Sequence, residues 1–550
     1  MKYVKQFLFI FLLVIFMISC SKQEKIGWNA ASRSGVVAAG NARSVAAGIE
    51  ILDQGGNAAD AAAATILALA ITDFGAFCIG GEVPFMIYDA EKQEVKVLSG
   101  QGAAPLNPKA MEWYYKNGIP MEDIQAAAVP AVVDLCVTAL VKYGTLTFND
   151  VVAPALRLLE GDEEAWYPDL ALTFRKLIDT EQTADGTREE KLRAVSDRFY
   201  RGDIADELDK WYRENGGLLT KEDLAAHTTR IEDPVTIKYR GYDVYKCNTW
   251  TQGPVLCQTL RLLEGFDLAT MGHLSPDYIH TIVESFKLSF ADRDFYYADP
   301  LFQEVPLDAL FSDAYTKIRR PLINMEKASY DIRPGDPVNL KPIVKGGLYR
   351  PGAAGTTTCC VADRWGNVVA ATPSGWGSNA GPAGNTGIVH GTRLRSLNTD
   401  PDHTNRIEPG KRPRITLTPT LVLKKGKPVL AISVVGGDVQ DQTTMNLLLD
   451  FVEFGMMPAD AVTAPRFATG HHEDSFNPAS NRRDAYEDLR GLWINNTVQE
   501  DIIQNLKKRG HEIRPRKGAI GDPVMIYIEP ESGMMYAAGD PDAGRHAAGM

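Results

Sequence analysis

The chain has 550 residues, of which 45% are apolar and 23% are charged, and its formal net charge at pH 7 is −12. A chain of this size and composition can bury a large core, arranged as one large domain or as several. The acidic balance excludes a nucleic-acid partner, because binding phosphates requires a basic face.

The first residues are predicted to be a targeting segment rather than part of the fold. Lys2 and Lys5 precede an apolar run over residues 7–18, which is short for a membrane span. The sequence Met-Ile-Ser-Cys that ends at Cys20 resembles a bacterial lipobox, in which the cysteine is lipid-modified and becomes the new N-terminus. We therefore expect a lipoprotein-type signal peptide over residues 1–19, a lipid anchor on Cys20 and export to the bacterial periplasm or cell surface. A tether would cover residues 20–33. A signal peptide without lipid is the alternative.

The elements that follow predict an α/β sandwich. Residues 45–53 have a helical pattern after Ser44, a candidate N-cap, and Asn57 is a candidate cap for an alanine-rich helix that continues to residue 71. Residues 108–330 are mostly helical in pattern. Strand patterns that would supply two stacked sheets occur at residues 85–88, 95–99, 368–371, 421–423, 429–433 and 525–528.

A threonine run follows a segment, residues 324–355, whose prolines and glycines predict an exposed linker. Gly355 is followed by Thr356-Thr357-Thr358 and then by a strand-like stretch. A threonine hydroxyl is a poor nucleophile unless a base lies beside it, and the residue's own α-amino group, freed by cutting the preceding peptide bond, is such a base. With a pKa of roughly 8, that amine can accept the hydroxyl proton near neutral pH. Thr356 is therefore a candidate nucleophile, with an ordinary strand as the alternative.

Two glycines further along the chain supply a candidate oxyanion hole. Residues 431–435 have the pattern of a buried strand, and Gly436-Gly437 end it. Glycines let backbone N–H groups approach a reacting carbonyl and hold the negative charge that develops on its oxygen. The sequence thus predicts both a nucleophile and an oxyanion hole.

A series of motifs runs in order through roughly residues 34 to 542. They lie at residues 34–39, 46–62, 239–242, 263–267, 290–293, 299–300, 411–413, 418–420, 436–437, 464–467 and 539–541. Through these motifs the chain resembles the γ-glutamyltransferase (γ-glutamyltranspeptidase) family of N-terminal-nucleophile hydrolases.

The resemblance implies a fold and a processing step. Family members fold as one chain, cut themselves before the nucleophilic threonine and keep both pieces as an αββα four-layer sandwich. Here the cut would fall between Gly355 and Thr356. It would give a large subunit, residues 34–355, and a small subunit, residues 356–550, which stay together as a heterodimer. The freed threonine would attack an amide carbonyl, and the acyl-enzyme would pass its acyl group to water or to an amine.

The resemblance also implies that some site residues are retained and others altered. Thr372 and Ser374 occupy the positions of hydroxyls that support the nucleophile, with ordinary strand residues as the alternative. The residues that bind the γ-glutamyl carboxylate differ. Gln101 stands where the family has an arginine, and Thr416, in the sequence Arg-Ile-Thr, keeps at most one hydroxyl of a Ser-Ser pair. Trp376 replaces an asparagine. Losing a bidentate charge partner costs on the order of 2 to 5 kcal/mol of recognition, so the glutamyl specificity is open.

The loop over residues 392–402 offers replacement charges. It occupies the place of the family's amino-group-binding loop, although no single residue there corresponds to a family residue. Arg393 or Arg395 could supply a cation to a carboxylate, and Asp400 or Asp402 an anion to an ammonium group. Solvated loop charges are the alternative.

We expect neither a cofactor nor a metal. The six cysteines after Cys20 include no C-x-x-C pair, and the nine histidines show no metal-ligand spacing. A zinc site and a disulfide scaffold are therefore disfavoured, and buried free thiols are expected.

Three functions remain open from the sequence. The first is a self-processing amidohydrolase or acyltransferase that acts on γ-glutamyl amides such as glutathione. The second is the same chemistry on a different small acyl amide, because Gln101, Ile415 and Trp376 alter the carboxylate contacts. The third is an exported binding lipoprotein that keeps the fold without turnover. An intact Thr356 disfavours the third, since a binding protein needs no processing threonine.

Overall fold

The computed structural model describes residues 26–161, 167–343, 355–375, 377–482, 485–486 and 488–550. The predicted signal peptide, Cys20 and Trp376 lie outside the described residues. Within the described ranges, no helix combines the length and the apolar character that crossing a bilayer requires.

Two seven-stranded antiparallel sheets form the centre of the described part of the chain. The first sheet contains, in spatial order, β19 (His546–Gly549), β2 (Gly35–Ala39), β10 (Cys359–Asp363), β11 (Val368–Ala371), β3 (Val83–Asp89), β4 (Glu94–Gly100) and β5 (Arg230–Glu232). The second contains β1 (Asn29–Ser32), β18 (Met535–Gly539), β17 (Asp522–Ile528), β13 (Lys427–Val435), β12 (Thr420–Lys424), β7 (Tyr242–Lys246) and β6 (Val235–Tyr239).

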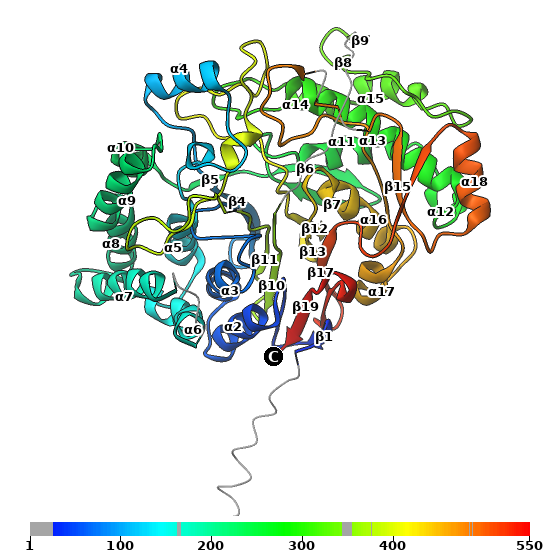
Figure 1. Cartoon of the computed structure of the whole chain (residues 1–550). Coiled ribbons are helices and arrows are strands. Elements are labelled where there is room, and N and C mark those ends of the chain that lie inside the picture. The colour runs from blue at the N-terminus through cyan, green and yellow to red at the C-terminus, as the bar shows by residue number, and fades with distance from the viewer. Residues whose placement is uncertain (1–25, 162–166, 344–354, 376, 483–484, 487) are drawn as a thin grey trace, which may run out of the picture.

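The two sheets face each other, and helices cover their outer faces (Figure 1). Apolar residues of both sheets, among them Val36, Cys360, Ala431 and Ile526, form the core between them. On the outer side of the first sheet, one core cluster joins the sheet to α2 (Ala42–Asp53), α3 (Ala58–Thr72), α5 (Val132–Tyr143), α6 (Phe148–Gly161), α7 (Tyr167–Thr183), α8 (Arg188–Tyr200), α9 (Asp203–Glu214) and α10 (Lys221–Ala226). The second sheet packs on α11 (Pro254–Leu263), α13 (Pro276–Tyr296), α15 (Asp313–Arg319), α16 (Gln440–Val452), α17 (Pro458–Thr463) and α18 (Glu500–Lys508). The predicted αββα sandwich is confirmed.

The predicted helices and strands are present, with shifts at their ends. Asn57 caps α3 as predicted: its side chain accepts hydrogen bonds from the first turn, and the Asp60 carboxylate accepts one from the Asn57 N–H. The start of α2 was predicted wrongly, because Asn41 rather than Ser44 is its N-cap. Ser44 is a buried helical residue whose hydroxyl contacts Thr72.

Parts of two segments that we expected outside the fold belong to it. Residues 29–32, within the expected tether, form β1, which pairs with β18. Part of residues 324–343, within the expected exposed linker, lies against the body of the protein, where the Ala328 N–H donates to the Arg509 carbonyl, whereas residues 338–342 are exposed. Where these segments contact the body, backbone N–H groups donate to it instead of to water. Residues 344–354 lie outside the described residues.

Shorter elements complete the description. They are α4 (Pro108–Asn117), α12 (Leu268–Met271), α14 (Leu307–Leu310), β8 (Gly335–Asp336), β9 (Lys341–Pro342), β14 (Phe467–Thr469), β15 (Gly491–Asn495) and β16 (Glu512–Arg516), with 3₁₀ turns η1 (Ile124–Ala126), η2 (Arg320–Leu322), η3 (Arg393–Ser396), η4 (Gly437–Val439) and η6 (Pro541–Ala543). The predicted buried free thiols are confirmed at Cys78, Cys136, Cys247, Cys257, Cys359 and Cys360.

Strands from either side of Thr356 are interleaved in both sheets. In the first sheet β2 pairs with β10 and β19, and β3 pairs with β11. In the second sheet β1 pairs with β18, and β7 pairs with β12. Each pair joins a strand that precedes Thr356 to one that follows it. A cut before Thr356 would therefore leave two pieces that share both sheets.

Candidate functional site

Several predicted site residues meet at the end of the first sheet where β10 begins. Thr356 forms an isolated antiparallel bridge with Ser374, and Ser374 forms a second one with Glu82. Because β4 pairs with β3 up to its last residue, Gln101 leaves the sheet beside Glu82. The order across this end of the sheet is therefore Thr356, Ser374, Glu82 and Gln101.

Two glycines allow these segments to come so close together. A Cβ on Gly81 would lie 2.2 Å from the Ser374 carbonyl oxygen, and a Cβ on Gly80 would lie 2.3 Å from the Val389 carbonyl oxygen. Real Cβ atoms do not approach backbone oxygens so closely, so no larger residue fits at either position. The Gly80-Gly81 pair thus brings the segment before β3 against both Ser374 and the segment that leads to η3.

The Ser374 hydroxyl lies at the centre of the polar contacts. Its Oγ is 3.3 Å from Thr356 Oγ1 and 2.5 Å from the carbonyl oxygen of Gly355. Arg393 Nη2 donates to the same Oγ over 2.7 Å. Thr356 is only 4% exposed and Ser374 is fully buried. Because these contacts are removed from bulk water, their electrostatic strength is greater than at the surface.

Arg393 is held by a buried carboxylate, Glu82. Its Nε lies 2.6 Å and its Nη2 2.5 Å from Glu82 Oε1. The backbones of Glu82 and Ser374 exchange two hydrogen bonds of 2.9 Å each. Burial raises the pKa of Glu82, and the positive charge of Arg393 opposes that shift. Arg393 is therefore a paired, buried charge in contact with Ser374, and not a solvated loop charge.

The residue after Thr356 anchors the threonine run. Thr357 Oγ1 donates to Asp73 Oδ2 over 2.5 Å, and Arg545 Nη1 lies 3.4 Å from both of these oxygens. A Cβ on Gly40 would lie 2.2 Å from Thr357 Oγ1, so the packing requires glycine there. Since successive side chains of an extended segment point to opposite faces, this anchor leaves Thr356 facing Ser374.

Thr372 connects the two sheets. Its Oγ1 lies 2.9 Å from Ser433 Oγ, and Ser433 donates to the Ala371 carbonyl over 2.8 Å. Ser433 belongs to β13, the strand that leads to Gly436. Among the described residues no hydrogen bond joins Thr372 to Thr356. Thr372 therefore links the segment that follows β11 to β13, the strand that precedes the glycine pair.

The glycine pair ends β13 with a change of backbone direction. Gly436 has φ 147° and Gly437 has φ 58°, values at which side chains other than glycine are strained. Over the described part of the chain, neither N–H donates a hydrogen bond to another protein group. Both N–H groups can therefore donate to an oxygen that enters the site.

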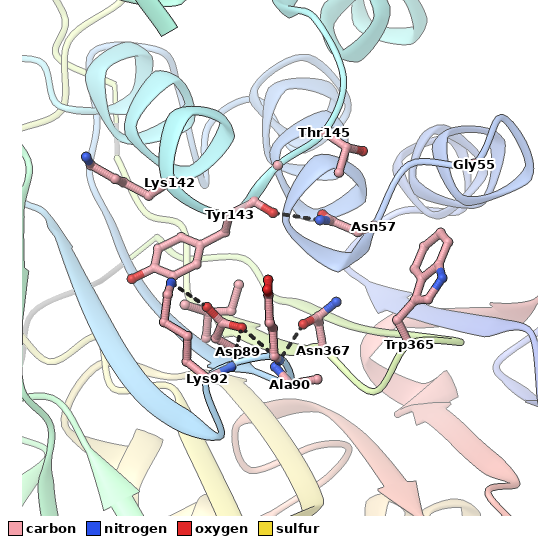
Figure 2. Close-up of a pocket in the computed structure, with 13 residues that line it drawn as sticks. Gly55, Asn57, Asp89, Ala90, Lys92, Lys142, Tyr143, Thr145, Trp365 and Asn367 are labelled. Atoms are coloured by element: carbon pink, nitrogen blue, oxygen red, sulfur yellow. Dashed lines mark hydrogen bonds and ion pairs between the residues drawn. The ribbon is translucent and has the colours of Figure 1, made fainter. Parts of the chain in front are cut away.

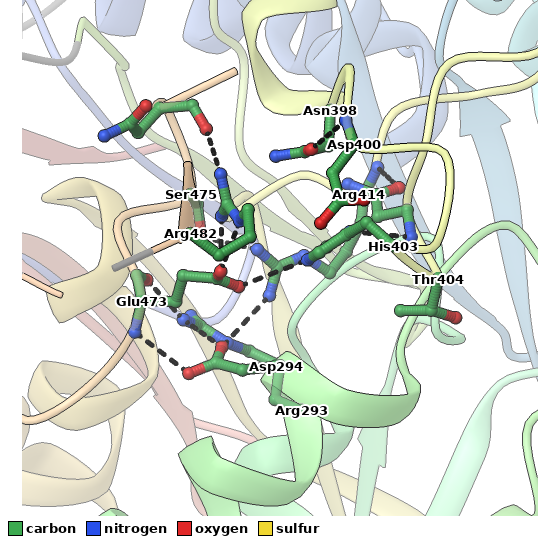
Figure 3. A network of polar contacts seen from close by, with 12 residues as sticks. Arg293, Asp294, Asn398, Asp400, His403, Thr404, Arg414, Glu473, Ser475 and Arg482 are labelled. Carbon is green, nitrogen blue, oxygen red and sulfur yellow. Dashed lines mark hydrogen bonds and ion pairs between the residues drawn. The ribbon is translucent and has the colours of Figure 1, made fainter. Parts of the chain in front are cut away.

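Asp438, which follows the glycine pair, forms an ion pair with Arg293, and Arg293 belongs to a buried network of charges with Asp294 and Glu473 (Figure 3). Arg293 forms an ion pair with Asp438, and Ser475 donates to Asp438 over 2.6 Å. Burial alone would raise the pKa of Asp438, but Arg293 and other positive neighbours outweigh it and hold the pKa at about 2. Asp294 pairs with Arg293 and accepts from the Glu473 N–H over 2.9 Å. The network fixes the residue that follows the glycines.

Asp400 and Asp402 lie on the outer side of this network. They line a cavity of about 220 Å³ together with Asp294, Glu473 and Arg482. Asp400 Oδ1 accepts from the Asp402 N–H over 3.0 Å, and Asp402 is exposed. Carboxylates placed in this way can attract an ammonium group. No contact between described residues joins either aspartate to Thr356.

The residues expected at the carboxylate-binding positions bring no cation of their own. Gln101 Nε2 donates to the carbonyl of the next residue over 2.9 Å. Gln101 Oε1 and Thr416 Oγ1 are buried without a hydrogen-bond partner among the described residues. Trp376 is not described. Both candidate arginines lie 5.5 Å from the ring centroid of Phe476, and Arg393 also donates to Ser374.

A larger cavity, of about 700 Å³, lies at the opposite end of the first sheet (Figure 2). Asp89 at the end of β3 and Trp365 and Asn367 in the turn between β10 and β11 line it. Polar side chains that line this cavity stabilise the turns around it. Asp89 forms an ion pair with Lys92 over 2.8 Å, and Asn367 accepts a hydrogen bond from the Ala90 N–H over 3.0 Å. None of the predicted site residues lines this cavity.

Sequence reasoning missed Glu82, Asp73 and Arg545. Glu82 had a usable signal, because it is the single charge in an apolar run over residues 77–88, and an isolated carboxylate in a buried strand requires a partner. Asp73 and Arg545 had no such signal, since their contact with Thr357 depends on segments that are far apart in the sequence.

Comparison with known proteins places this geometry in a family. The sequence model of the family described as gamma-glutamyltranspeptidase matches residues 44–163 and 163–550. The glutathione hydrolase-like YwrD proenzyme of Bacillus subtilis (strain 168) is 31% identical over 539 residues, which cover 92% of this chain and 96% of that protein. The glutathione hydrolase proenzyme of Escherichia coli (strain K12) is 30% identical over 570 residues, which cover 95% of this chain and 93% of that protein.

A solved structure agrees with these sequence matches. Cephalosporin acylase from Bacillus halodurans is 26% identical to this chain with a TM-score of 0.76, and the match covers 97% of this chain and 98% of that one. These relatives are enzymes, so we set aside the non-catalytic binding protein. The chain belongs to the γ-glutamyltranspeptidase family and is a self-processing amidohydrolase with the αββα sandwich fold.

Proposed function

We propose that Thr356 is the nucleophile, both for the cut between Gly355 and Thr356 and for turnover of substrate. The contact between Thr356 Oγ1 and Ser374 Oγ carries this proposal, because it puts the hydroxyl in a buried polar setting next to the Gly355 carbonyl. After the cut, the freed α-amine of Thr356 is the base that takes the hydroxyl proton. Ser374 supports the nucleophile directly, and Thr372 supports it through the segment after β11 that also contains Ser374.

The oxyanion of the substrate is held by the N–H groups of Gly436 and Gly437. Both N–H groups lack an acceptor among the described residues, and the Thr372–Ser433 contact connects β13, the strand before the glycines, to the segment that contains Ser374. Donors that are fixed before the reaction begins stabilise a tetrahedral intermediate without reorganisation.

The substrates are γ-glutamyl amides such as glutathione, and the acyl group passes to water or to an amine. Two relatives, one named a glutathione hydrolase and one named glutathione hydrolase-like, each aligned over more than nine-tenths of this chain, support this assignment. Asp400 and Asp402 are the proposed partners of a substrate ammonium group, and they line a common cavity.

A different small acyl amide is the second candidate. Gln101 offers a neutral amide where the family has an arginine, and Thr416 retains one hydroxyl at the second carboxylate contact. Trp376 replaces an asparagine. The similarity to a cephalosporin acylase supports the same alternative.

The mature protein is a heterodimer in which the large subunit, residues 34–355, keeps residues 20–33 at its N-terminus and pairs with the small subunit, residues 356–550, because both sheets contain strands of each piece. We further propose export through the signal peptide over residues 1–19 and attachment to a membrane through a lipid on Cys20. This part rests on the sequence alone. The mass of the mature N-terminus and partition into detergent, compared between the parent and Cys20→Ala, would test it.

The decisive experiment is intact mass of the purified protein beside Thr356→Ala, with Thr358→Ala as the matched control. Thr358 is equally buried in the same run, and its hydroxyl has no hydrogen-bond partner among the described residues. We expect two fragments, one beginning at Thr356, from the parent and from Thr358→Ala, and one uncut chain from Thr356→Ala. Turnover of a γ-glutamyl anilide by the cut protein then selects γ-glutamyl chemistry. If the cut protein turns over other acyl anilides but not the γ-glutamyl anilide, the second candidate is selected. A parent protein that is neither cut nor active would reject both candidate functions.

A further inference from the structure

The Ser374 hydroxyl has a full set of hydrogen-bond partners. A serine hydroxyl carries one proton to donate and two lone pairs that accept, an arginine can only donate, and a backbone carbonyl can only accept. Arg393 Nη2 lies 2.7 Å from Ser374 Oγ and therefore uses one lone pair. The Gly355 carbonyl oxygen, at 2.5 Å, must receive the Ser374 proton. The second lone pair is left for Thr356 Oγ1 at 3.3 Å.

Glu82 keeps Arg393 in the position that produces this arrangement. The guanidinium is only 6% exposed, and a buried charge without a partner would be strongly destabilising. Glu82 Oε1 contacts both Nε and Nη2, which fixes the plane of the guanidinium and aims Nη2 at Ser374. The carboxylate and the serine are themselves fixed to each other by two backbone hydrogen bonds.

We infer that Arg393, held by Glu82, is a positioning residue for self-cleavage. It turns the Ser374 hydroxyl so that the proton points at the Gly355 carbonyl oxygen, which is the oxygen that becomes negative when Thr356 attacks. The inference rests on the proposed cut between Gly355 and Thr356. It gives the chain's own carbonyl a side-chain donor, separate from the glycine N–H groups proposed for the substrate.

The step balances without an added reagent. Thr356 Oγ1 forms a bond to the Gly355 carbonyl carbon, and the C=O electron pair moves to the oxygen, where the Ser374 proton meets it. The C–N bond then breaks, and the proton lost by Thr356 Oγ1 ends on the departing nitrogen, so an ester replaces the amide. Water cleaves the ester to give the Gly355 carboxylate and a free N-terminal threonine. The positive charge next to Ser374 Oγ strengthens the hydrogen bond to the developing oxyanion.

The test measures the rate at which the freshly made full-length chain is cut, by intact mass over time. Ser374→Ala removes the proposed donor, and we expect cleavage about 10²-fold slower, as for loss of an oxyanion donor elsewhere. The double variant Glu82→Gln/Arg393→Met removes both charges together, so that no unpaired charge remains buried, and we expect cleavage about 10-fold slower. Arg393→Lys keeps the positive charge but loses the planar guanidinium that contacts Glu82 and Ser374 together. Its cleavage rate should lie between that of the double variant and that of the parent.

A matched control is Asp292→Asn/Arg319→Met, which removes another buried ion pair, joining α13 and α15. It should be cut at the parental rate. If the Glu82/Arg393 double variant is also cut at that rate while Ser374→Ala is slow, the role of Arg393 is overturned. If Thr356→Ala is cut, the proposed function fails instead. Should the double variant not fold, judged by thermal unfolding, Arg393→Lys decides: the parental rate overturns the inference and a slowed rate supports it.

Discussion

The two ends of the first sheet differ in how their polar side chains are used. At the Asp89 end there is a cavity of about 700 Å³, but Asp89 and Asn367 are occupied in holding turns. At the Thr356 end the side chains are buried, and the contacts of Ser374 converge on the Gly355 carbonyl and on a hydroxyl. The comparison teaches that the larger cavity does not by itself identify a candidate reaction site in this molecule. The convergence of hydrogen bonds on the Gly355 carbonyl is the better guide.

The strongest test of the comparison is Thr356→Ala. Removing the hydroxyl removes the only group proposed to attack either the chain or the substrate, so we expect no cut and at least a 10³-fold loss of anilide turnover. Intact mass and a chromogenic assay measure both effects. A variant that still turned over substrate would show that the nucleophile lies elsewhere.

A second change separates the two proposed oxyanion sites. Gly437→Ala places a Cβ at φ 58° and shifts an N–H proposed to hold the substrate oxyanion. We expect kcat on the anilide to fall about 10²-fold. The cut should proceed at close to the parental rate, since the Gly355 oxygen is contacted by Ser374. Equal loss of both rates would contradict two separate sites.

His390, which lies near the Thr356 end of the sheet, should make the unfolding free energy decrease at acidic pH. This ring is buried, Nε2 lies 2.6 Å from the Tyr212 hydroxyl, and burial lowers its pKa to about 4. Between pH 6.5 and 4 the unfolded chain therefore binds one proton more than the folded chain, and stability falls as the pH falls. The slope for one such group is at most about 1.4 kcal/mol per pH unit.

His390→Gln should make that slope shallower. Unfolding of the uncut Thr356→Ala background by denaturant, from pH 4.5 to 7, measures it for both versions of residue 390. His227, whose pKa burial also lowers to about 4, should leave part of the slope in place. An unchanged slope in the variant would mean that His390 is not neutral in the folded protein at low pH.

The smallest effects are expected at the opposite end of the sheet. Asp89→Asn weakens the pair with Lys92 and the turn that it caps, and we expect a loss of about 1 kcal/mol in unfolding free energy. Trp365→Ala removes a half-exposed ring from the cavity. Cleavage and anilide turnover should both stay within about twofold of the parent in these variants, since neither residue touches the Thr356 end. A larger loss of turnover would give this cavity a part in the reaction.

Much of the fold was predictable because its signals are local. Asn57 and its alanine-rich helix, and strands such as residues 368–371, follow from capping and from apolar runs. The N-cap of α2 was predicted wrongly because Asn41 and Ser44 are both good caps, and packing against Thr72 decided between them.

Those residues of the candidate site that belong to a distinctive local sequence motif could be predicted. Thr356 and the glycine pair stand out in the sequence, and the resemblance adds Ser374. The partnership of Glu82 with Arg393 was not predictable, because it joins residues 311 positions apart. The sequence did not distinguish Arg393 from Arg395, and only the contacts of Arg393 with Glu82 and Ser374 show which one reaches the site.

Because strands from both sides of Thr356 are interleaved in the sheets, a cut chain would refold less readily than an uncut one. As an uncut chain, the protein can find its two sheets by a first-order search, since all strands are covalently linked. If the bond before Thr356 is cut as proposed, complete unfolding would release two polypeptides, and refolding would require them to meet in a bimolecular reaction that slows with dilution. The cut protein would then depend on how slowly it unfolds, and no longer on a reversible folding equilibrium.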